Sequence, residues 1–509
     1  MKRYVNFRPI VLTAISFSLG TAAFLFSRLS LLPLAIVLLF IPVAIGLVCT
    51  FFGKFSVSKA IICIVSFELV LLAGFFNVKL HYDNFYGAQV DGECTVTATF
   101  EREEFYSTSH ALYFSEATVE FNGKKYNNQN IIVYADPNVK FSLGDRLSFT
   151  ADLHTAYTVR NGKPDVSAFI YGNRFEGYSD FANAEPSSSG GGLFGRIRRS
   201  LIKTIHSGMS DENAAIATAM LLGDKTDVST ATISGMRYAG IAHLFAVSGL
   251  HIGLISTFLY VILKRFKVQR WIIFGVCTFC AFFYCAVCGF SSSAVRAFIM
   301  FTTYLLSRTL GTKHDALNGI AFSAFTLILI RPQNLFSYGF ILSFAAVISI
   351  AVYSGAFARF LSFIPFGIDR DISSVLSAQL GTLPLNSAFF GYTTLISFLV
   401  NLILLPLITF FFTILFLCTV FAFIFGGEQI FLYVPNVLVG FMSRFVSDID
   451  FSVFVINGYS SASASVIFYS GALLASDLFN FTAKTKFVIF SVCLAACMII
   501  SRLFAVGVF

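Results

Sequence analysis

The sequence predicts a polytopic α-helical membrane protein of about 11 to 13 spans, some of them broken or re-entrant, with a small extracytoplasmic β-barrel domain inserted after the early spans. Of the 509 residues, 56% are hydrophobic, 12% are charged and 63 are phenylalanine. The mean hydropathy is +0.78, which excludes an ordinary soluble domain. Charge is also divided by region. Residues 81–185 carry 15 acidic and 8 basic side chains, a net of −7, and the remainder carries 12 acidic and 27 basic, a net of +15.

Three apolar runs predict three N-terminal transmembrane helices within residues 1–80. The runs cover residues 9–26, 31–52 and 59–79, and each is long enough to cross the hydrocarbon core. The basic start MKRYVNFR resembles a signal sequence, but no small-residue cleavage site follows it, so we interpret the first run as a retained span. Lys54 and Lys59 lie in the loop between the second and third runs. Since basic loops stay in the cytoplasm, the N-terminus is expected inside and residues 81–184 outside.

The acidic region, residues 81–184, has the two-residue periodicity of β-strands. In CTVTATFERE, the side chains of Cys94, Val96, Ala98 and Phe100 alternate with polar neighbours. Asn122-Gly123 is the dipeptide that favours a type I′ hairpin turn. Further strands are expected at residues 130–135 and 146–153, so about five short strands predict a small barrel or sandwich. EPSSSGGG, residues 185–192, predicts a flexible linker.

The segment after the linker, residues 193–236, is expected to form amphipathic helices at the membrane surface. In LFGRIRRSLIKTIHSGM, apolar residues recur on one side of a helix and are accompanied by Arg196, Arg198, Arg199 and Lys203. Two interpretations stay open: contact with anionic lipid headgroups, or contact with a nucleic acid or a partner.

Residues 237–509 contain the remaining predicted spans. They are expected at residues 241–263, 271–288, 294–310, 316–330, 338–353, 396–425, 430–446, 466–481 and 487–504. The loop KRFKVQR, residues 264–270, is expected in the cytoplasm. Residues 372–394 contain Gly381, Pro384 and Gly391, so a helix there is expected to be broken or re-entrant.

HLFAVSGLH, residues 243–251, places His243, Ser248 and His251 in an apolar run. Polar side chains are costly in hydrocarbon, so these three should face protein or water. Gly249 and Gly253 form a G-x-x-x-G pair that is typical of close helix packing. Alternatively, these glycines and Gly240 mark a discontinuous helix whose unwound turn lines an aqueous cavity. A catalytic Ser-His pair is a third reading, but no carboxylate lies nearby in sequence to orient the histidine.

Residues 220–253, MLLGDKTDVSTATISGMRYAGIAHLFAVSGLHIG, resemble the signature of the ComEC competence family, the membrane channel that brings transforming DNA into bacterial cells. Two further blocks are similar to the family: GFSSSAVRAFIM with RPQNLFSYGFILSFAA, and LGTLPLNSAFFGYTTLISFLVNLILLPL. The resemblance extends over roughly residues 1–410. It implies that the β segment is an OB-fold and that residues 237–509 are a competence-type channel domain in the bacterial inner membrane.

The sequence departs from the family in two respects. Many members carry a metallo-β-lactamase-like domain with an H-x-H-x-D-H site, and none of the seven histidines here falls in that pattern. We therefore expect no enzymatic activity, no metal and no cofactor, and a separate nuclease. An OB-fold that grips single strands uses a basic groove, whereas this region is acidic. Phosphate contact would need a local patch such as Lys124 with Lys125, or Arg160 with Lys163.

A DNA path through hydrocarbon needs water together with basic or hydrogen-bonding groups. Intramembrane Arg296, which follows Ser292 in GFSSS, is the most informative candidate. Its alternative role is to pair with a carboxylate or with carbonyl groups inside the bundle. The expected path is lined by Asp224, Lys225, Arg237, His243, Ser248, Gly249, His251, Ser292 and Arg296.

Two other patterns bear on energy supply and on metal binding. Cys277, Cys280, Cys285 and Cys288 form two C-x-x-C pairs, but they lie in a predicted span, where cysteine behaves as a small hydrophobe. No P-loop occurs, so transport energy is expected from a separate cytoplasmic ATPase or helicase, or from the membrane potential. Further expected partners are single-stranded DNA, membrane lipids, a DNA receptor and, as a homo-oligomer, a second copy.

Two functions therefore remain in view. The first is transport of single-stranded DNA across the cytoplasmic membrane during transformation. The second is a membrane enzyme, or a transporter of a lipid or envelope component, built on the same scaffold with Ser248 and His251 binding the ligand. A continuous basic, water-filled path would favour the first, and a closed apolar pocket the second.

Overall fold

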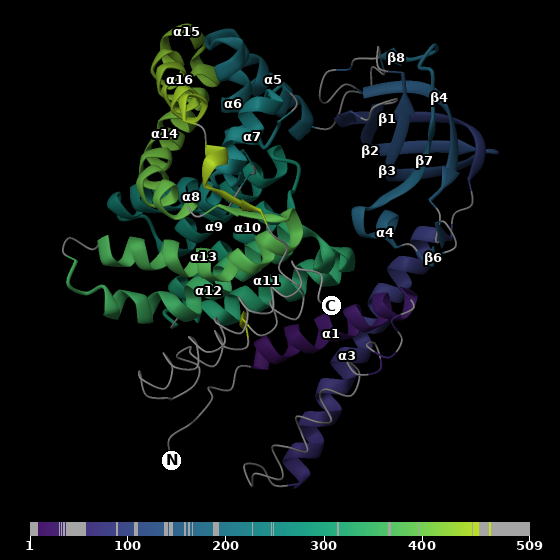
Figure 1. The fold of residues 1–509 in the computed structure, drawn as a ribbon, viewed down its shortest axis with the longest axis horizontal. Helices are drawn as coiled ribbons and strands as arrows, with labels where there is room; N and C mark the ends of the chain where they lie inside the picture. Colours follow the sequence, from purple (N-terminus) through teal and green to yellow (C-terminus); the bar gives the residue numbers. More distant parts are fainter. Residues whose placement is uncertain are drawn as a thin grey trace. The chain divides into compact units, whose positions relative to one another are not determined.

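The computed structural model of the chain divides into two compact units (Figure 1). The structure describes residues 9–29, 31, 33, 36, 57–87, 90–105, 110–136, 141, 146–156, 159–160, 163–164, 166–186, 193–225, 227–245, 247, 249–312, 315–364, 368–394, 396–449, 451–457, 468 and 469. The first unit comprises Lys203–Ser323 and Tyr338–Phe509 with the first nine residues, and the second comprises Ile10–Ile202 and Ala324–Ser337.

Two N-terminal helices open the second unit. Helix α1 spans Pro9–Arg28 and α3 spans Val57–Tyr86, which confirms the expected first and third apolar helices. The expected second span, at residues 31–52, lies almost wholly outside the described residues. The 30 residues of α3 extend about 45 Å, which exceeds the roughly 30 Å of hydrocarbon. The end of α3 therefore reaches beyond the membrane core.

The two helices cross closely through glycines. A Cβ on Gly20 would lie 1.9 Å from the Leu71 carbonyl oxygen, and one on Gly74 would lie 2.3 Å from the Phe17 carbonyl oxygen. The Ser16 hydroxyl donates to the Phe67 carbonyl at 2.6 Å beside this crossing. Small residues allow the backbones to approach, which is how helices associate where lipid removes the hydrophobic driving force.

The acidic region forms a sheet whose pairings close on themselves. Its strands are β1 (Asp91–Phe105), β2 (His110–Phe121), β3 (Lys124–Ala135), β4 (Arg146–Thr155), β7 (Asn173–Tyr178) and the short β8 (Glu185–Pro186). The order is β1-β2-β3-β7-β4-β8, and β1 also pairs with β4. Only the β3–β7 pair in this sheet is parallel. Strand β7 was missed because its sequence, NRFEGY, alternates weakly, and the expected strand at 130–135 is the second half of the longer β3.

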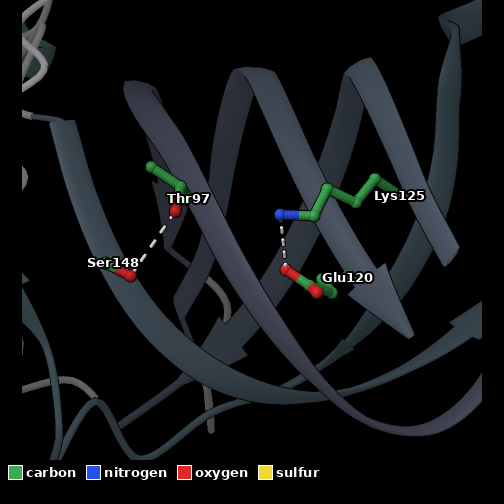
Figure 2. Close-up of polar contacts among 4 residues, drawn as sticks. All are labelled: Thr97, Glu120, Lys125 and Ser148. Atoms are coloured by element: carbon green, nitrogen blue, oxygen red, sulfur yellow. Dashed lines mark hydrogen bonds and ion pairs between the residues drawn. The ribbon is translucent and has the colours of Figure 1, made fainter. Parts of the chain in front are cut away.

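Figure 2 shows polar contacts across two of these pairings. Thr97 on β1 faces Ser148 on β4, and their hydroxyl oxygens lie 3.4 Å apart where the sheet closes. Lys125 Nζ lies 3.1 Å from Glu120 Oε2 beside the turn that joins β2 and β3. That turn, Asn122-Gly123, has φ of 49° and 75°, so the predicted hairpin is confirmed. The predicted inward positions Cys94, Val96, Ala98 and Phe100 are also buried.

An aromatic cluster joins the sheet to the N-terminal helices. Helix α4 (Ser167–Tyr171) buries Phe169 against Tyr82 and Phe85 near the end of α3, with ring centroids 5.4 and 5.5 Å apart. Arg174 Nη2 on β7 donates to the Asn84 carbonyl at 2.6 Å. The sheet is therefore attached to α3 by side-chain contacts as well as by the covalent connection.

The first unit is helical. Its longer helices are α6 (Asp211–Leu222), α7 (Thr230–Tyr238), α8 (Gly249–Arg265), α9 (Arg270–Val287), α10 (Ser292–Leu310), α12 (Tyr338–Phe360), α13 (Ile368–Phe390), α14 (Ser397–Phe425) and α16 (Tyr433–Asp448). Helices α5 (Leu193–Gly208) and α11 (Ala316–Ile330) cross the division between the units. Its short elements are η1 (Ala242–Phe245), α15 (Glu428–Phe431), η3 (Phe451–Phe454), and the strands β9 (Tyr392–Thr394) and β10 (Val455–Asn457). The short helix η2 (Pro332–Phe336) belongs to the second unit.

Three expectations about these helices were wrong. Helix α6 is not amphipathic, because every residue from Ala214 to Leu222 is buried. Residues 241–263 do not form one helix, since η1 precedes a helix that begins only at Gly249. Helix α13 runs unbroken through Gly381 and Pro384 and ends before Gly391, whose φ is +74°.

Helix α13 stays intact because its neighbour packs tightly at the glycine. A Cβ on Gly381 would lie 2.1 Å from the Ser349 hydroxyl on α12, so α12 and α13 lie side by side there (Figure 1). The Tyr469 hydroxyl donates to the Gly381 carbonyl at 2.7 Å. A proline removes one helical hydrogen bond, and neighbouring helices and side chains can stabilise the remaining turn.

The chain is a multi-pass membrane protein. In the described residues, five helices are long and apolar enough to cross a membrane: Pro9–Arg28, Ile64–Tyr86, Arg270–Val287, Tyr338–Phe360 and Leu407–Phe425. The predicted spans at 466–481 and 487–504 lie outside the described residues, apart from residues 468 and 469.

Candidate functional site

The expected path residues begin at the end of α6. Gly223 has φ of +75° and ends the helix, and its N–H donates to the Ala219 carbonyl at 3.0 Å. The Tyr284 hydroxyl on α9 donates to the Leu221 carbonyl at 2.6 Å, so a distant helix satisfies one of the terminal acceptors of α6. Asp224 is 8% exposed, whereas Lys225 next to it is exposed. Only Lys225 of these two charges is therefore available to a ligand.

Lys225 and Arg237 lie close enough for their charges to interact. Partial desolvation by the surrounding protein lowers the pKa of Lys225, although part of its side chain stays exposed, and the Arg237 guanidinium lowers it further. Arg237 is exposed near the end of α7, whose first turn is capped where the Thr232 N–H donates to the Ser229 hydroxyl at 3.1 Å. Each positive charge disfavours the charged form of the other, and a bound anion would relieve this repulsion.

The turn after α7 is fixed by a segment that follows it by more than 150 residues. Gly240 has φ of +76°, and a Cβ there would lie 2.2 Å from Cβ of Ser397. The Asn401 amide donates to the Gly240 carbonyl at 3.3 Å and to the Ser397 carbonyl at 2.7 Å. The first and third sequence blocks that resemble one family therefore meet at this glycine.

The glycines that follow were expected either to pack a helix or to break one. Helix α8 begins at Gly249, after η1, so the break is present. A Cβ on Gly249 would touch Cβ of Ala297 at 3.6 Å, an ordinary contact, and one on Gly253 would meet no described residue within 4 Å. Close packing therefore does not explain Gly253. Ser248 lies outside the described residues, so its expected contact with His251 stays untested.

The two histidines of the signature segment, residues 220–253, have different environments. His243, on η1, is exposed, whereas the side chain of His251, on α8, is 0% exposed. The His251 imidazole stacks on Phe412 of α14, with centroids 4.1 Å apart. His251 is thus a packed core residue in this structure, and His243 is the accessible one.

Arg296 is buried inside the first unit on α10. Its side chain is 3% exposed, and its Nη2 donates to the Ser293 hydroxyl at 3.1 Å. The guanidinium carbon lies 5.3 Å from the ring centroid of Phe344 on α12. Nη1 is buried without a hydrogen-bond partner, and among the described residues no carboxylate lies within ion-pair distance of Arg296. The described residues therefore provide no carboxylate partner for Arg296, which was one alternative role expected from the sequence.

The structure does not bring the other expected contact residues together with Arg296 or with the signature segment. Arg196 is exposed and Arg198 and Arg199 are half-buried on the part of α5 in the second unit, whereas exposed Lys203 belongs to the first. The Ser292 side chain is outside the described part. Lys125 is paired with Glu120, and the side chains of Arg160 and Lys163 are not described, so the sheet region offers no basic patch among its described residues beyond Lys124.

A cavity of about 490 Å³ lies between α5, α6 and α7. Its lining includes Asp211, Glu212, Asp227 and His206, and no Lys or Arg. His206 Nε2 lies 3.8 Å from Asp227 Oδ2. An acidic lining repels phosphate, so this cavity does not suit a polyanion. Within the described residues, no group of three or more His, Cys, Asp or Glu side chains could hold a metal ion.

The sequence interpretation missed several residues that shape the site. Phe344 and Phe412 contact the expected path residues Arg296 and His251 from other helices, and Ser397 and Asn401 contact the turn at Gly240. The polar pair Ser397 and Asn401 in an apolar run was a usable signal, because polar side chains in a span face protein or water. Phe344 and Phe412 could not be singled out in this way, because the chain contains 63 phenylalanines.

The comparisons with known proteins point in one direction. The profile of the family described as "Competence protein" matches residues 220–480, half of the chain. ComE operon protein 3 of Bacillus subtilis is 28% identical over 214 residues, which is 42% of this chain and 27% of that protein. An uncharacterized protein of Aquifex aeolicus is 27% identical over 281 residues, 54% of this chain and 64% of that protein.

The uncharacterized protein YcaI of Escherichia coli is 27% identical over 209 residues, covering 38% of this chain and 27% of that protein. The chain thus spans about a quarter of the length of two of these relatives. No solved structure matches. Since the family profile covers both the signature segment and the Arg296 helix, the chain belongs to the competence protein family.

Proposed function

We propose that this protein carries single-stranded DNA across the bacterial cytoplasmic membrane during natural transformation, along an aqueous path lined by polar and basic groups of residues 237–509. The observation that carries the proposal is the buried guanidinium of Arg296, which has a free Nη1 and no carboxylate partner among the described residues. Family membership supplies the link to competence.

A buried arginine without a counter-ion is costly, and its charge cannot be removed at physiological pH. Such a group is retained where an anion passes or binds. The guanidinium fork matches a phosphate, and its charge-assisted hydrogen bonds are stronger than neutral ones. One Arg296 donor is held by Ser293 and the cation rests on the Phe344 ring, so the fork is oriented before any ligand arrives.

The proposed path continues from the signature segment. Lys225, Arg237 and His243 are exposed groups that phosphates would meet, and Arg296 is the buried one. Weak contacts in series let a polyanion bind and move on. On this proposal the protein is a transporter and not an enzyme. A DNA receptor, a separate nuclease and a cytoplasmic ATPase or helicase act with it, and the channel forms as a monomer or a homo-oligomer.

The proposed orientation follows from the basic loops. The N-terminus and KRFKVQR lie in the cytoplasm, and the sheet region lies outside. Its closed pairing order, with one parallel pair, supports an OB-type barrel. Because that region carries a net charge of −7, we propose that it positions the channel and does not grip DNA itself. The exposed Arg196 and Lys203 of α5 are proposed to contact anionic lipid headgroups.

The test is uptake of labelled DNA by a deletion strain that carries wild type, Arg296→Gln or Arg308→Gln. Arg308 lies on the same helix but is exposed, and its Nε donates to the Tyr304 hydroxyl one turn away at 3.0 Å, so it controls for loss of one positive charge from α10. Removing a charge-assisted bond costs at least about tenfold in affinity, so Arg296→Gln should reduce uptake by about tenfold or more. Arg308→Gln should leave it near wild type.

Arg296→Lys adds a second comparison, since lysine keeps the charge but loses the fork. Intermediate uptake is expected. Wild-type uptake by Arg296→Gln would remove the arginine from the path. If the deletion strain takes up DNA normally, the cargo is not DNA, and a phosphate-bearing lipid or envelope component becomes the better candidate for the same guanidinium.

A further inference from the structure

Two tyrosines from distant segments meet beside the exposed cations of the first unit. Tyr238 is the last residue of α7 and Tyr392 is the first residue of β9. Their ring centroids lie 6.0 Å apart with planes inclined at 66°. Both side chains are half-exposed, so each ring keeps an accessible part. The ring centroid of Phe390, which is 50% exposed, lies 6.3 Å from that of Tyr392, so Phe390 extends the aromatic surface.

Positive charge adjoins this pair. Arg237 precedes Tyr238 in the chain and is exposed. Burial raises the pKa of the Tyr392 hydroxyl while the Arg237 charge lowers it, which places Arg237 within electrostatic reach of the ring from the other segment. Lys225 is within reach of Arg237 in the same way. The nearest acidic residues in sequence are Asp224, which is buried, and Asp227, whose Oδ2 lies 3.8 Å from His206 Nε2.

The arrangement is held rigidly. Gly391, with φ of +74°, turns the chain out of α13 into β9, and Tyr392 pairs with Asn457 of β10. On the other side, Gly240 abuts Ser397, and Asn401 bridges the two segments. The Ser397 hydroxyl also donates to the Thr394 carbonyl at 2.7 Å. The rings are therefore positioned before a ligand binds, which reduces the entropy lost on binding.

We propose that Tyr238 and Tyr392, flanked by Arg237 and Lys225, form a stacking platform that binds the bases of single-stranded DNA while the two cations hold its phosphates. Every base has a π-face, so rings beside cations bind single strands without sequence preference. The proposal deepens the proposed function, because it rests on a nucleic-acid cargo and names the residues that recognise the unpaired bases. A duplex keeps its bases stacked and would not use the platform.

The first experiment measures binding of a labelled oligo(dT) and of an abasic oligonucleotide of the same length to the purified full-length chain. The abasic strand keeps its phosphates and has no bases to stack. The variants are Tyr392→Leu and Tyr238→Leu, with Tyr392→Phe as the conservative change. Tyr433→Leu is the control, since Tyr433 is 66% exposed on α16 of the same unit.

Loss of one stacked base should weaken oligo(dT) binding by about tenfold in each leucine variant. Tyr392→Phe and Tyr433→Leu should bind oligo(dT) as wild type does, and abasic binding should change in none of the four. Arg237→Gln should weaken both oligonucleotides and reduce the slope of log affinity against log salt by about 0.7, the value for one phosphate of a single strand.

Two results would overturn the platform. One is unchanged oligo(dT) binding by both leucine variants. The other is an equal loss of abasic binding, which would mean that the substitution disturbs the cations or the fold. Thermal unfolding of each variant in detergent identifies a folding defect, and Tyr392→Phe then still tests whether a ring alone suffices.

Failure of the platform and failure of the proposed function give different results. If Arg296→Gln abolishes uptake while both leucine variants bind oligo(dT) and support uptake normally, DNA transport stands and the platform is wrong. If the deletion strain takes up DNA normally, transport of DNA is wrong whatever the tyrosines bind.

Discussion

The imidazole of His251 lies flat on the phenyl ring of Phe412, with centroids 4.1 Å apart and planes 9° apart. The contact joins α8 to α14, and both rings are 0% exposed. Aromatic pairs of this kind contribute beyond the area that they bury. A histidine of the signature segment, residues 220–253, therefore contributes through packing in this structure.

The pair of signature histidines yields the first prediction. His251→Ala leaves a cavity against Phe412 and should reduce the free energy of unfolding by about 2 to 4 kcal/mol. His243→Ala removes an exposed side chain and should change it by less than about 0.5 kcal/mol. Thermal or denaturant unfolding of the purified chain in detergent measures both. Equal stability of the two variants would contradict the packing role.

Uptake of DNA by the same strains separates stability from transport. His251→Ala should impair uptake more than Cys280→Ala, because Cys280 on α9 is only half-buried and packs as a small hydrophobe. The opposite order would show that the cysteine pairs matter more than their place in a span suggests.

A second prediction contrasts two glycines of the signature segment. Gly240→Ala introduces a Cβ at positive φ and against Ser397, so we expect a loss of about 2 to 4 kcal/mol in unfolding free energy. Gly253→Ala adds a methyl group where none of the residues described by the structure lies within 4 Å, and alanine is the better helix former by about 1 kcal/mol. It should be neutral or stabilising. The unfolding midpoints of the two variants and of wild type test both expectations. A destabilised Gly253→Ala variant would restore the helix-packing explanation for Gly253.

A third prediction concerns Cys94 in the sheet region. Burial raises the pKa of its thiol to about 11. The thiolate is the reactive form, so at pH 8 the folded protein should not label at Cys94 with a maleimide, and labelling should need denaturant or a pH near 11. The comparison is Asn127→Cys, an exposed position on β3 of the same region. Mass spectrometry of the labelled peptides locates the adduct. Rapid native labelling of Cys94 would contradict its burial.

The same Asn127→Cys variant tests the proposed orientation. A membrane-impermeant maleimide added to intact spheroplasts should label this cysteine if the sheet region lies outside. A cysteine placed in the KRFKVQR loop, at exposed Lys267, should label only after the membrane is opened. Reversed labelling would invert the topology, because positive charges bias loops to the cytoplasm but do not compel them.

Much of this architecture could be predicted from local composition. The runs that became α1, α9, α12 and α14 are apolar over span length, and the two-residue alternation from Cys94 to Phe100 became the inward face of β1. The Asn122-Gly123 turn followed from backbone preference alone. Helix α6 was misjudged because the arginines of the preceding segment suggested a surface position, whereas its own sequence, AAIATAMLL, has no polar face.

The sequence by itself determined which segments are apolar enough to cross a membrane and which form strands, because hydropathy and strand periodicity are local properties of neighbouring residues. Only the tertiary structure decided which polar groups meet. Arg296 on Phe344, His251 on Phe412 and Tyr238 beside Tyr392 each join segments from about 50 to 160 residues apart. Tertiary packing also decided the form of α13, which contains Pro384 and stays helical while it packs against α12 at Gly381. Such contacts depend on how helices pack, and packing is not encoded in any single stretch of the chain.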